Sequence, residues 1–501
     1  MEFLDLLGLG LSTALSWDNL LYCFVGVLLG TMIGVLPGLG PTATIALLLP
    51  ITFSLSPVSA MIMLAGIYYG AQYGGSTTAI LVNLPGEASS VVTALDGYQM
   101  ARQGRAGPAL AVAALGSFVA GTLATLVVAV FAPILTQAAL AVGPAEYFAL
   151  MVLGLICAVA LAQGSLLNAL AMVVLGVIVG LVGSDVYTAT PRLTFGMLEL
   201  FDGVNIVAIA VGVFGIAEIL RNLEQPQSSG AAIAKVGKLM PSRQEARDSV
   251  GPITRGTVLG SLLGVLPGGG ALLSSFLSYS LEKRLSKTPE RFGKGAIEGV
   301  AGPESANNAG AQTSFIPMLT LGLPSNAVMA LMISALIIQG IVPGPDVITS
   351  RPDLFWGLIA SMWIGNLMLV ILNLPLIGLW VRLISVPYRA LFPAIIIFAV
   401  IGTFTVNSSP FDLYTIIVFG ALGYVLIKLD NEPAPLLLGI VLGPLLEENL
   451  RRALVIARGD ALAMIQRPLT ATLLITTVIL LVIAALPAIT SRRRQIFEEA
   501  D

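Results

Sequence analysis

Long apolar segments alternate with short polar or glycine-rich breaks along most of this chain. A helix needs about 20 mostly apolar residues to cross the hydrocarbon core of a bilayer. Residues 3–16 are shorter and predict a short apolar or interfacial helix, and the short segment 435–446 leaves open whether it spans. The segments that predict membrane-spanning helices are 108–134, 146–162, 165–183, 203–221, 354–381, 391–406, 412–429 and 467–489.

The composition indicates an all-α polytopic membrane protein. Hydrophobic residues make up 56% of the 501 positions and charged residues only 11%, far from the balance of a soluble domain. The 53 glycines and 29 prolines predict interrupted helices. The chain has no histidine, which excludes Ser-His triads and His-ligated metals. Cys23 and Cys157 each lie within an apolar run, which argues against a disulfide.

The two halves of the chain carry related motifs. The pattern Gly-x3-Gly-x3-Gly-Val-Leu-Pro-Gly-x-Gly over residues 26–40 recurs over 256–270, at an offset of 230 residues (256 minus 26). Two later matches, at offsets of 240 and 239, pair Gly70-Ala71-Gln72 with Gly310-Ala311-Gln312, and Leu84-Pro85-Gly86 with Leu323-Pro324-Ser325. Because the three matches occur in the same order in both halves, they predict an internal duplication.

The distribution of basic residues predicts that the two halves are inverted relative to each other. The first basic residue of the chain is Arg102, whereas five lysines and arginines lie within 283–294, just after the second glycine motif. The matching stretch of the first half, 53–58, has none. Because lysine and arginine mark the cytoplasmic side, equivalent loops are expected on opposite faces. Inverted repeats of this kind are typical of secondary transporters.

This reasoning predicts about 11 transmembrane helices, two re-entrant hairpins with Pro-Gly tips and two broken helices. Residues 256–281 start and finish beside cytoplasmic charge, so they are expected to form one hairpin, and 26–52 forms the other by symmetry. The predicted organisation is a first repeat at 1–221 (hairpin 26–52, broken-helix region 57–95, scaffold helices 108–221), a cytoplasmic linker at 222–255, a second repeat at 256–446 (hairpin 256–281, broken-helix region 310–342, scaffold helices 354–446), and a loop, final transmembrane helix and basic C-terminus at 447–501.

Each predicted break creates a new helix N-terminus, and these four starts are the candidate binding site. Non-helical backbone survives at membrane depth only where protein buries it or water lines it. Free N–H groups and the partial positive charge of a helix start bind anions, and no lysine or arginine lies within these motifs. For the spaced glycines Gly26, Gly30 and Gly34, close helix packing is the favoured interpretation. The candidate substrate-binding residues are Gly38, Gly40, Thr42, Asn83, Gly86, Ser89, Gly268, Gly270, Ser274, Ser325 and Asn326.

Further polar residues near the breaks are candidates for the cavity wall and for a cation. Polar groups at membrane depth usually line a pathway, and carbonyl or threonine oxygens at broken-helix ends suit Na⁺. Glu298 and Glu304 leave two interpretations open, a deep position or a solvated interfacial helix. The predicted cavity-lining residues are Gln72, Ser76, Thr77, Gln312 and Thr313, and the predicted Na⁺ ligands are Leu36, Thr44, Leu266 and Leu323.

Other acidic residues are expected to be solvated, because they fall at predicted outer helix ends. A dinucleotide-binding interpretation of the glycines fails, since no strand precedes Gly38-x-Gly40. No cofactor and no nucleic-acid partner is expected. The solvated acidic residues are Glu146, Asp185, Glu199 and Asp202.

Three motifs resemble the large permease subunit of the tripartite tricarboxylate transporters, the TctA family. They lie at 34–42 (GVLPGLGPT), 69–76 (YGAQYGGS) and 302–309 (GPESANNA). The resemblance covers nearly the whole chain. It implies a multi-pass carrier for carboxylates in the bacterial inner membrane. It also implies a small four-helix membrane subunit, a periplasmic solute-binding protein that delivers substrate, and an ion gradient, Na⁺ in the best-known members, with H⁺ as the alternative.

The expected function is therefore secondary active import of small carboxylates, of the citrate-like di- and tricarboxylate class, by alternating access of an elevator type. Two alternatives from other classes stay open. An anion channel would share a dipole-lined cavity. A membrane-embedded enzyme acting on a lipid carrier would need acid, base or metal-ligating groups, which the lack of histidine makes scarce.

Overall fold

The protein is described here from a computed structural model, over residues 3–36, 40–140, 142–162, 165–224, 236–266, 270–384, 386 and 388–486. Within these ranges the fold is all-α, as predicted, except for two short antiparallel strands, β1 (Gly183–Ser184) and β2 (Pro191–Arg192). Seven helices of the described chain are long and apolar enough to cross a membrane: Trp17–Gly34, Ala106–Leu140, Pro144–Leu161, Ile206–Glu224, Pro352–Asn373, Pro410–Lys428 and Pro468–Ala485.

The first part of the chain forms six helical elements, of which α4 is the central helix. Residues 3–16 were expected to be helical, and α1 occupies most of them. Helix α2 starts before the predicted hairpin and is long enough to span on its own. Residues Val58 to Val82 of α4 are all buried, which makes it a core helix. The elements are α1 (Phe3–Ala14), α2 (Trp17–Gly34), α3 (Pro41–Thr52), α4 (Pro57–Val82), η1 (Ala88–Ser90) and α5 (Val91–Arg102).

The second glycine motif leads into a similar set of helices. The sequence Ser242-x-x-Glu245 forms a capping box that starts α11 inside the predicted linker, so the linker is shorter than expected. Residues Gly299 to Thr313 of α13 are all buried. The elements are α11 (Arg243–Leu263), α12 (Gly270–Leu285), η4 (Pro289–Arg291), α13 (Glu298–Thr313), α14 (Phe315–Leu321) and α15 (Ala327–Ile338).

The spaced glycines hold α2 against α4 and α11 against α13 in the same way. A Cβ atom added at any of these glycines would collide with a backbone carbonyl of the facing helix, which confirms the packing interpretation. The second set of carbonyls lies 239 residues after the first (302 minus 63). The pairs are Gly26–Met63, Gly30–Ile67 and Gly34–Ala71 in one half, and Gly256–Gly302, Gly260–Ala306 and Gly264–Gly310 in the other.

Both Leu-Pro breaks also begin alike. Helix α4 ends at Asn83 (φ 59°) and α14 ends at Gly322 (φ 67°), each in the left-handed conformation that glycine and asparagine tolerate best. These two residues are again 239 positions apart (322 minus 83). The packing contacts therefore share the offset of the Leu-Pro motifs and not that of the Gly-Ala-Gln match.

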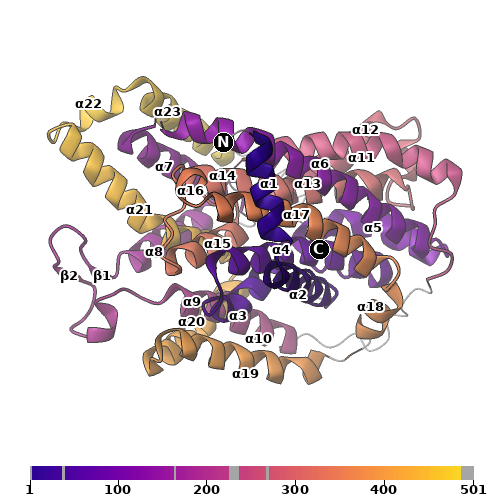
Figure 1. The fold of residues 1–501 in the computed structure, drawn as a ribbon, viewed down its shortest axis with the longest axis horizontal. Helices are drawn as coiled ribbons and strands as arrows, with labels where there is room; N and C mark the ends of the chain where they lie inside the picture. Colours follow the sequence, from indigo (N-terminus) through magenta and orange to yellow (C-terminus); the bar gives the residue numbers. More distant parts are fainter. Residues whose placement is uncertain are drawn as a thin grey trace.

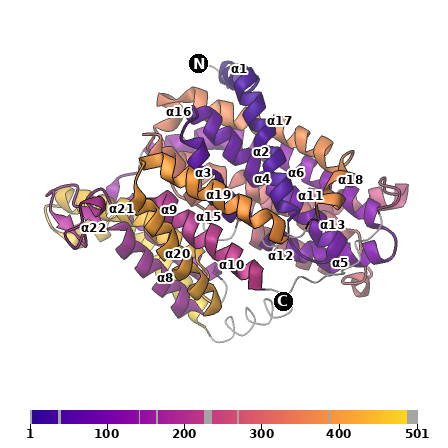
Figure 2. The same ribbon diagram turned by 90° about the horizontal axis from the view of Figure 1, so that it is seen from below.

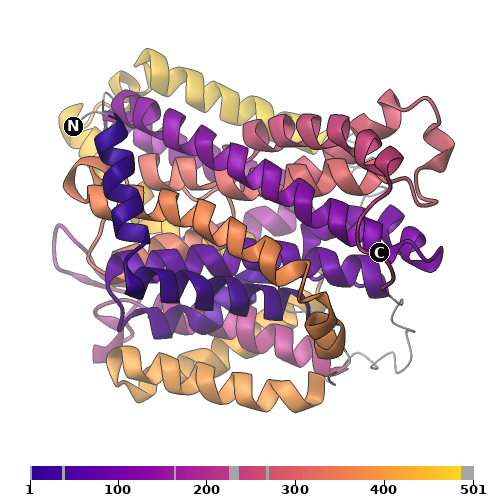
Figure 3. The ribbon, with the colours of Figure 1, turned by 45° about the vertical axis from the view of Figure 1, so that its right-hand side comes forward.

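The remaining helices surround this core (Figures 1 and 2). With 35 residues, α6 is about 52 Å long at 1.5 Å per residue, and it runs beside α13 and α17 (Figure 3). The predicted span 354–381 is divided into α17 and α18, and 435–446 belongs to the longer α21. The elements are α6 (Ala106–Leu140), α7 (Pro144–Leu161), α8 (Leu166–Gly180), η2 (Leu198–Leu200), α9 (Ile206–Ala210), the π-helical η3 (Val211–Ile216), α10 (Ala217–Glu224), α16 (Val347–Ser350), α17 (Pro352–Asn373), α18 (Ile377–Ile384), α19 (Tyr388–Asn407), α20 (Pro410–Lys428), α21 (Ala434–Ile456), α22 (Ala461–Ile465) and α23 (Pro468–Ala485).

Two acidic residues expected to be solvated are buried instead. Asp185 at the end of β1 is 4% exposed and pairs with Arg451 of α21 at 2.8 Å. Glu146 in the first turn of α7 pairs with Arg467 at 3.1 Å. Each carboxylate is compensated by an arginine far away in the sequence, so the local sequence pattern could not predict that it is buried. Glu199 and Asp202 are exposed, as predicted.

Candidate functional site

Four helix starts line one cavity of about 280 Å³. They are the starts at the four breaks that the sequence analysis singled out, two from each half of the chain. Gly40 in extended conformation precedes Pro41, the first residue of α3, where proline is favoured. Residues 87–89, at η1, and the first residues of α12 and α15 complete this part of the wall. The residues from the starts are Gly40, Pro41, Thr42, Glu87, Ala88, Ser89, Gly270, Ala271, Leu272, Asn326, Ala327 and Val328.

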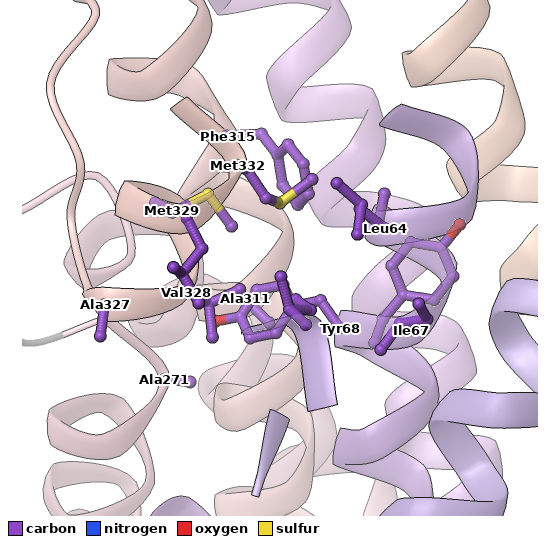
Figure 4. Packing of buried hydrophobic residues seen from close by; sticks show 14 of the residues in the cluster. Leu64, Ile67, Tyr68, Ala271, Ala311, Phe315, Ala327, Val328, Met329 and Met332 are labelled. Atoms are coloured by element: carbon purple, nitrogen blue, oxygen red, sulfur yellow. The ribbon is translucent and has the colours of Figure 1, made fainter. Parts of the chain in front are cut away.

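An apolar cluster lies behind one side of the cavity. Figure 4 shows Tyr68 of α4 among Val328 of α15 and Ala311 of α13, with Phe315 and Met332 close by. The Tyr68 and Phe315 ring centroids are 6.3 Å apart. Because these side chains are buried and tightly packed, the cavity is closed on this side in the conformation described.

Asn326 of the second half and Tyr68 of the first meet at the cavity wall. The Asn326 side-chain carbonyl accepts the Met329 N–H at 2.9 Å, which caps α15. Its amide nitrogen donates to the Tyr68 hydroxyl at 3.3 Å. A single amide therefore fixes a helix start and joins it to the central helix α4.

A buried carboxyl group, Glu87, also lines the cavity. Its Oε1 accepts hydrogen bonds from the Ser89 hydroxyl at 2.6 Å and from the Asn307 amide nitrogen at 2.9 Å. The Ser89 oxygen lies 3.2 Å from Oε1 of Gln72 on α4. Glu87 thus stands where the helix start of the first break meets α13 of the second half.

The cavity wall carries carboxyl groups without a basic side chain among the described lining residues. Besides Glu87, Glu432 lies in the wall. The positive character of the cavity comes from helix N-termini, each equivalent to roughly half a charge, and from polar hydrogens. The described wall therefore combines helix starts, which attract negative charge, with carboxyl groups, which attract positive charge.

A second, much smaller cavity of about 10 Å³ lies between α4, α6, α13 and α17. Glu304 of α13 is fully buried there, which decides between the two interpretations that the sequence left open for it. Both carboxylate oxygens accept hydroxyl hydrogen bonds, one from Ser76 at 2.6 Å and one from Thr93. Glu298, six residues earlier, is partly exposed and pairs with Arg291 at 2.6 Å; it is the solvated one of the two.

The structure brings six of the predicted site residues together at the large cavity, while others lie elsewhere. Gly38 and Gly268 lie outside the described residues. Asn83 is exposed, and Gly86 is buried with its Cα facing the Gly34 carbonyl. The Ser274 hydroxyl donates to the Gly270 carbonyl and that of Ser325 points to the Ser314 carbonyl. The six that line the cavity are Gly40, Thr42, Gln72, Ser89, Gly270 and Asn326.

The remaining predicted wall and Na⁺ residues do not line the large cavity. Ser76 and Thr77 line the small one instead. Gln312 and Thr313 are buried on α13 and lie at neither. Of the proposed Na⁺ ligands, Leu266 is 50% exposed and Leu323 and Leu36 are buried. The Thr44 hydroxyl donates to the Gly40 carbonyl at 2.9 Å, at the start of α3.

The sequence analysis did not select Glu87, Tyr68, Thr93 or Asn307 as site residues. Glu87 directly follows the Leu-Pro-Gly break, and that position was the available signal. The others become visible only when α4, α5 and α13 come together, because each of their contacts joins residues from different parts of the chain.

A helical multi-pass protein in which helix starts from both halves of the chain meet at one cavity has the architecture of a membrane transporter. A model of the tripartite tricarboxylate transporter TctA family matches residues 20–438. The chain belongs to this family.

Two proteins of Agrobacterium vitis are similar to this chain. The first is an uncharacterised 52.8 kDa protein in the TAR-I ttuC' 3' region, 63% identical over 501 residues, which is all of both chains. The second is an uncharacterised protein in the TAR-II ttuC' 3' region, 67% identical over 242 residues, 48% of this chain and all of that protein. No solved structure matches the chain.

Proposed function

We propose that this chain is the permease subunit of a secondary transporter that imports small di- or tricarboxylates across the bacterial inner membrane. In this proposal a periplasmic binding protein delivers the substrate, a small membrane subunit completes the complex, and a cation gradient, preferentially of Na⁺, drives uptake. Family membership supports transport of this class. The observation that carries the proposal is the meeting of four helix starts at one cavity.

The size and chemistry of the large cavity suit a small carboxylate. Its volume of about 280 Å³ is at the lower end of the range for small-molecule sites. Backbone N–H groups at helix starts bind carboxylates without a basic side chain. The Thr42 hydroxyl and the second amide hydrogen of Asn326 supply further hydrogen-bond donors, whereas the Ser89 hydroxyl already donates to Glu87.

The acidic groups of the wall favour cation-coupled transport over an anion channel. A carboxylate that enters beside Glu87 meets like charge, which opposes its binding unless a cation or a proton is bound at the same time. A requirement for simultaneous binding is the thermodynamic basis of symport. A channel for anions would gain nothing from carboxyl groups in its path.

Two related halves around one cavity support alternating access. The repeated contacts of α2 with α4 and of α11 with α13 make each a compact pair that can move as a unit. In our proposal these pairs, with the broken segments, carry the cavity between the two sides, and helices such as α6, α7, α8 and α20 to α23 form the scaffold.

Uptake by reconstituted vesicles tests this function. The chain, its small membrane subunit and the cognate binding protein would be incorporated and supplied with radiolabelled di- and tricarboxylates under an inward Na⁺ gradient. We expect accumulation that depends on both the gradient and the binding protein. We also expect the Pro324→Ala variant to insert normally into the membrane but to lose carboxylate uptake. Passive flux independent of every cation gradient, with single-channel currents, would favour the channel alternative instead.

A further inference from the structure

We propose that the small cavity beside Glu304 is a binding site for one Na⁺ ion that is coupled to substrate transport. The proposal rests on the function given above and assigns the coupling ion to particular residues. It differs from the sequence-based expectation, which placed Na⁺ at the helix ends of Leu36, Thr44, Leu266 and Leu323.

The first observation is a fully buried carboxylate without an ion pair among the described residues. Glu304 is 0% exposed, and among the described residues its carboxylate accepts side-chain hydrogen bonds from the hydroxyls of Ser76 and Thr93 alone. Burying an uncompensated carboxylate costs several kcal/mol in general. Two neutral hydroxyls compensate it only in part, so a bound cation would remove most of the remaining cost.

The second observation is independent of Glu304 and concerns Asn373 at the end of α17. Its Oδ1 atom is buried and has no hydrogen-bond partner, while its amide nitrogen donates to the Leu369 carbonyl at 3.0 Å. Asn373 lines the same small cavity. A buried carbonyl oxygen without a donor is rare in folded proteins, and a cation in the cavity would satisfy it.

The cavity has the size and the ligands for a small hard cation. Its volume of about 10 Å³ corresponds to about one water-sized sphere. Hard cations prefer oxygen ligands, and the polar groups in the wall are oxygens from hydroxyl, carboxyl and amide side chains. A proton on Glu304 would neutralise the carboxylate but leave the Asn373 oxygen unsatisfied, which favours Na⁺ over H⁺. The polar residues in the wall are Tyr73, Ser76, Thr77, Ser117, Glu304 and Asn373.

Two short connections join this site to the large cavity. On α13, Asn307 lies one turn after Glu304 and donates to Glu87, which lines the large cavity. On α4, the Ser76 hydroxyl contacts both Glu304 and the carbonyl of Gln72, whose side chain reaches the large cavity. A change at Glu304 on Na⁺ binding is therefore transmitted to the substrate site through two rigid helices.

Direct binding of ²²Na⁺ to the purified full-length chain in detergent tests the proposal. We expect saturable binding that unlabelled Na⁺ displaces and K⁺ does not, and that is weakened at least about tenfold in the Glu304→Gln variant. The Asn373→Leu variant should weaken it as well, through loss of a ligand oxygen. Glu298→Gln, on the same helix but paired with Arg291, is the matched control and should bind Na⁺ like the wild type.

The outcomes separate this proposal from the proposed function. Full ²²Na⁺ binding by Glu304→Gln, or no Na⁺ binding by a wild-type chain that still accumulates carboxylate under a pH gradient, would overturn the Na⁺ site and leave the transporter standing. If the wild type binds Na⁺ and Glu304→Gln does not, but the wild type takes up no carboxylate under any gradient, the Na⁺ site stands and the proposed function is wrong. Thermal melting in K⁺ shows whether Glu304→Gln is folded. If it is not, Na⁺ binding by the Asn373→Leu variant decides whether the small cavity is the Na⁺ site.

Discussion

The amide nitrogen of Asn307 donates to Oε1 of Glu87 across 2.9 Å, although 220 positions separate the two residues. Asn307 belongs to the central helix α13 of the second half, and Glu87 follows the Leu-Pro break of the first. The bond therefore ties the segment after the first Leu-Pro break to a core helix of the second half of the chain. It also places a carboxyl group in the wall of a cavity that helix starts otherwise make attractive to anions.

Replacing Glu87 with glutamine should loosen the dependence of carboxylate binding on cations. The variant keeps an acceptor for Ser89 and Asn307 but removes the charge that opposes the substrate. Two charges at about 4 Å interact by about 1–4 kcal/mol near a protein surface, so we expect about tenfold tighter carboxylate binding in Na⁺-free buffer. Isothermal titration with and without Na⁺ measures this. Glu298→Gln should behave like the wild type, and unchanged affinity in Glu87→Gln would contradict the role of this charge.

Two substitutions at Asn326 separate its role in folding from its role at the cavity. Asn326→Ala removes the cap of α15 and should destabilise the protein by about 1 kcal/mol. Asn326→Ser keeps a capping oxygen but loses the amide donor, so we expect near-normal thermal stability with a raised KM for uptake. Equal KM values for Asn326→Ser and the wild type would show that this side chain does not contact substrate.

Gly86→Ala should strongly destabilise the first break. An added Cβ would collide with the Gly34 carbonyl and lie 2.6 Å from the Gly75 Cα, and overpacking of this kind costs about 1–3 kcal/mol. Gly8→Ala is the matched control, because nothing lies within 4 Å of a Cβ there and alanine favours a helix. Thermal melting in detergent compares them. A Gly86→Ala protein that melts like Gly8→Ala would mean that the close approach of Gly86 to Gly34 is absent.

The buried ion pair of Asp185 predicts a defined pH dependence. The backbone N–H of Thr188, together with Arg451, holds the pKa of Asp185 below its ordinary value of 3.8. A lowered folded-state pKa means that the stabilisation is fully present above the unfolded value and is lost as the pH falls through the folded one. Asp185→Asn should therefore lower the melting temperature equally at pH 7 and pH 5. A difference from the wild type that already shrinks between these two pH values would argue against the ion pair.

The sequence predicted those features that depend on local signals. Pro41 after Gly40 and Asn326 after Leu-Pro each mark a helix start through their own backbone preferences, and the spaced glycines mark close helix contacts. Apolar length predicted most scaffold helices, although not the division of 354–381 or the full extent of α21. The start of α11 was missed because basic residues around its capping box resembled a linker.

The polar contacts within the site could not be predicted, because they form only in the assembled fold. Glu304 comes soon after the basic stretch 283–294 in the sequence, so the sequence alone could not decide whether its side chain is buried or exposed. Its partners Ser76 and Thr93 lie more than 200 positions away. Asn83 and Leu266 carry suitable groups in suitable motifs, yet the backbone at each break turns them outward.

Protection of a single cysteine by substrate tests most directly whether the large cavity binds carboxylate. In a chain with Cys23 and Cys157 replaced, the Ser89→Cys variant places a thiol in the cavity wall, and Asn83→Cys places one six residues earlier at an exposed site outside it. We predict that the transported carboxylate, in the presence of Na⁺, slows modification of Ser89→Cys by a negatively charged thiol reagent and leaves Asn83→Cys unaffected. Equal modification rates for Ser89→Cys with and without substrate would contradict the binding site proposed for this transporter.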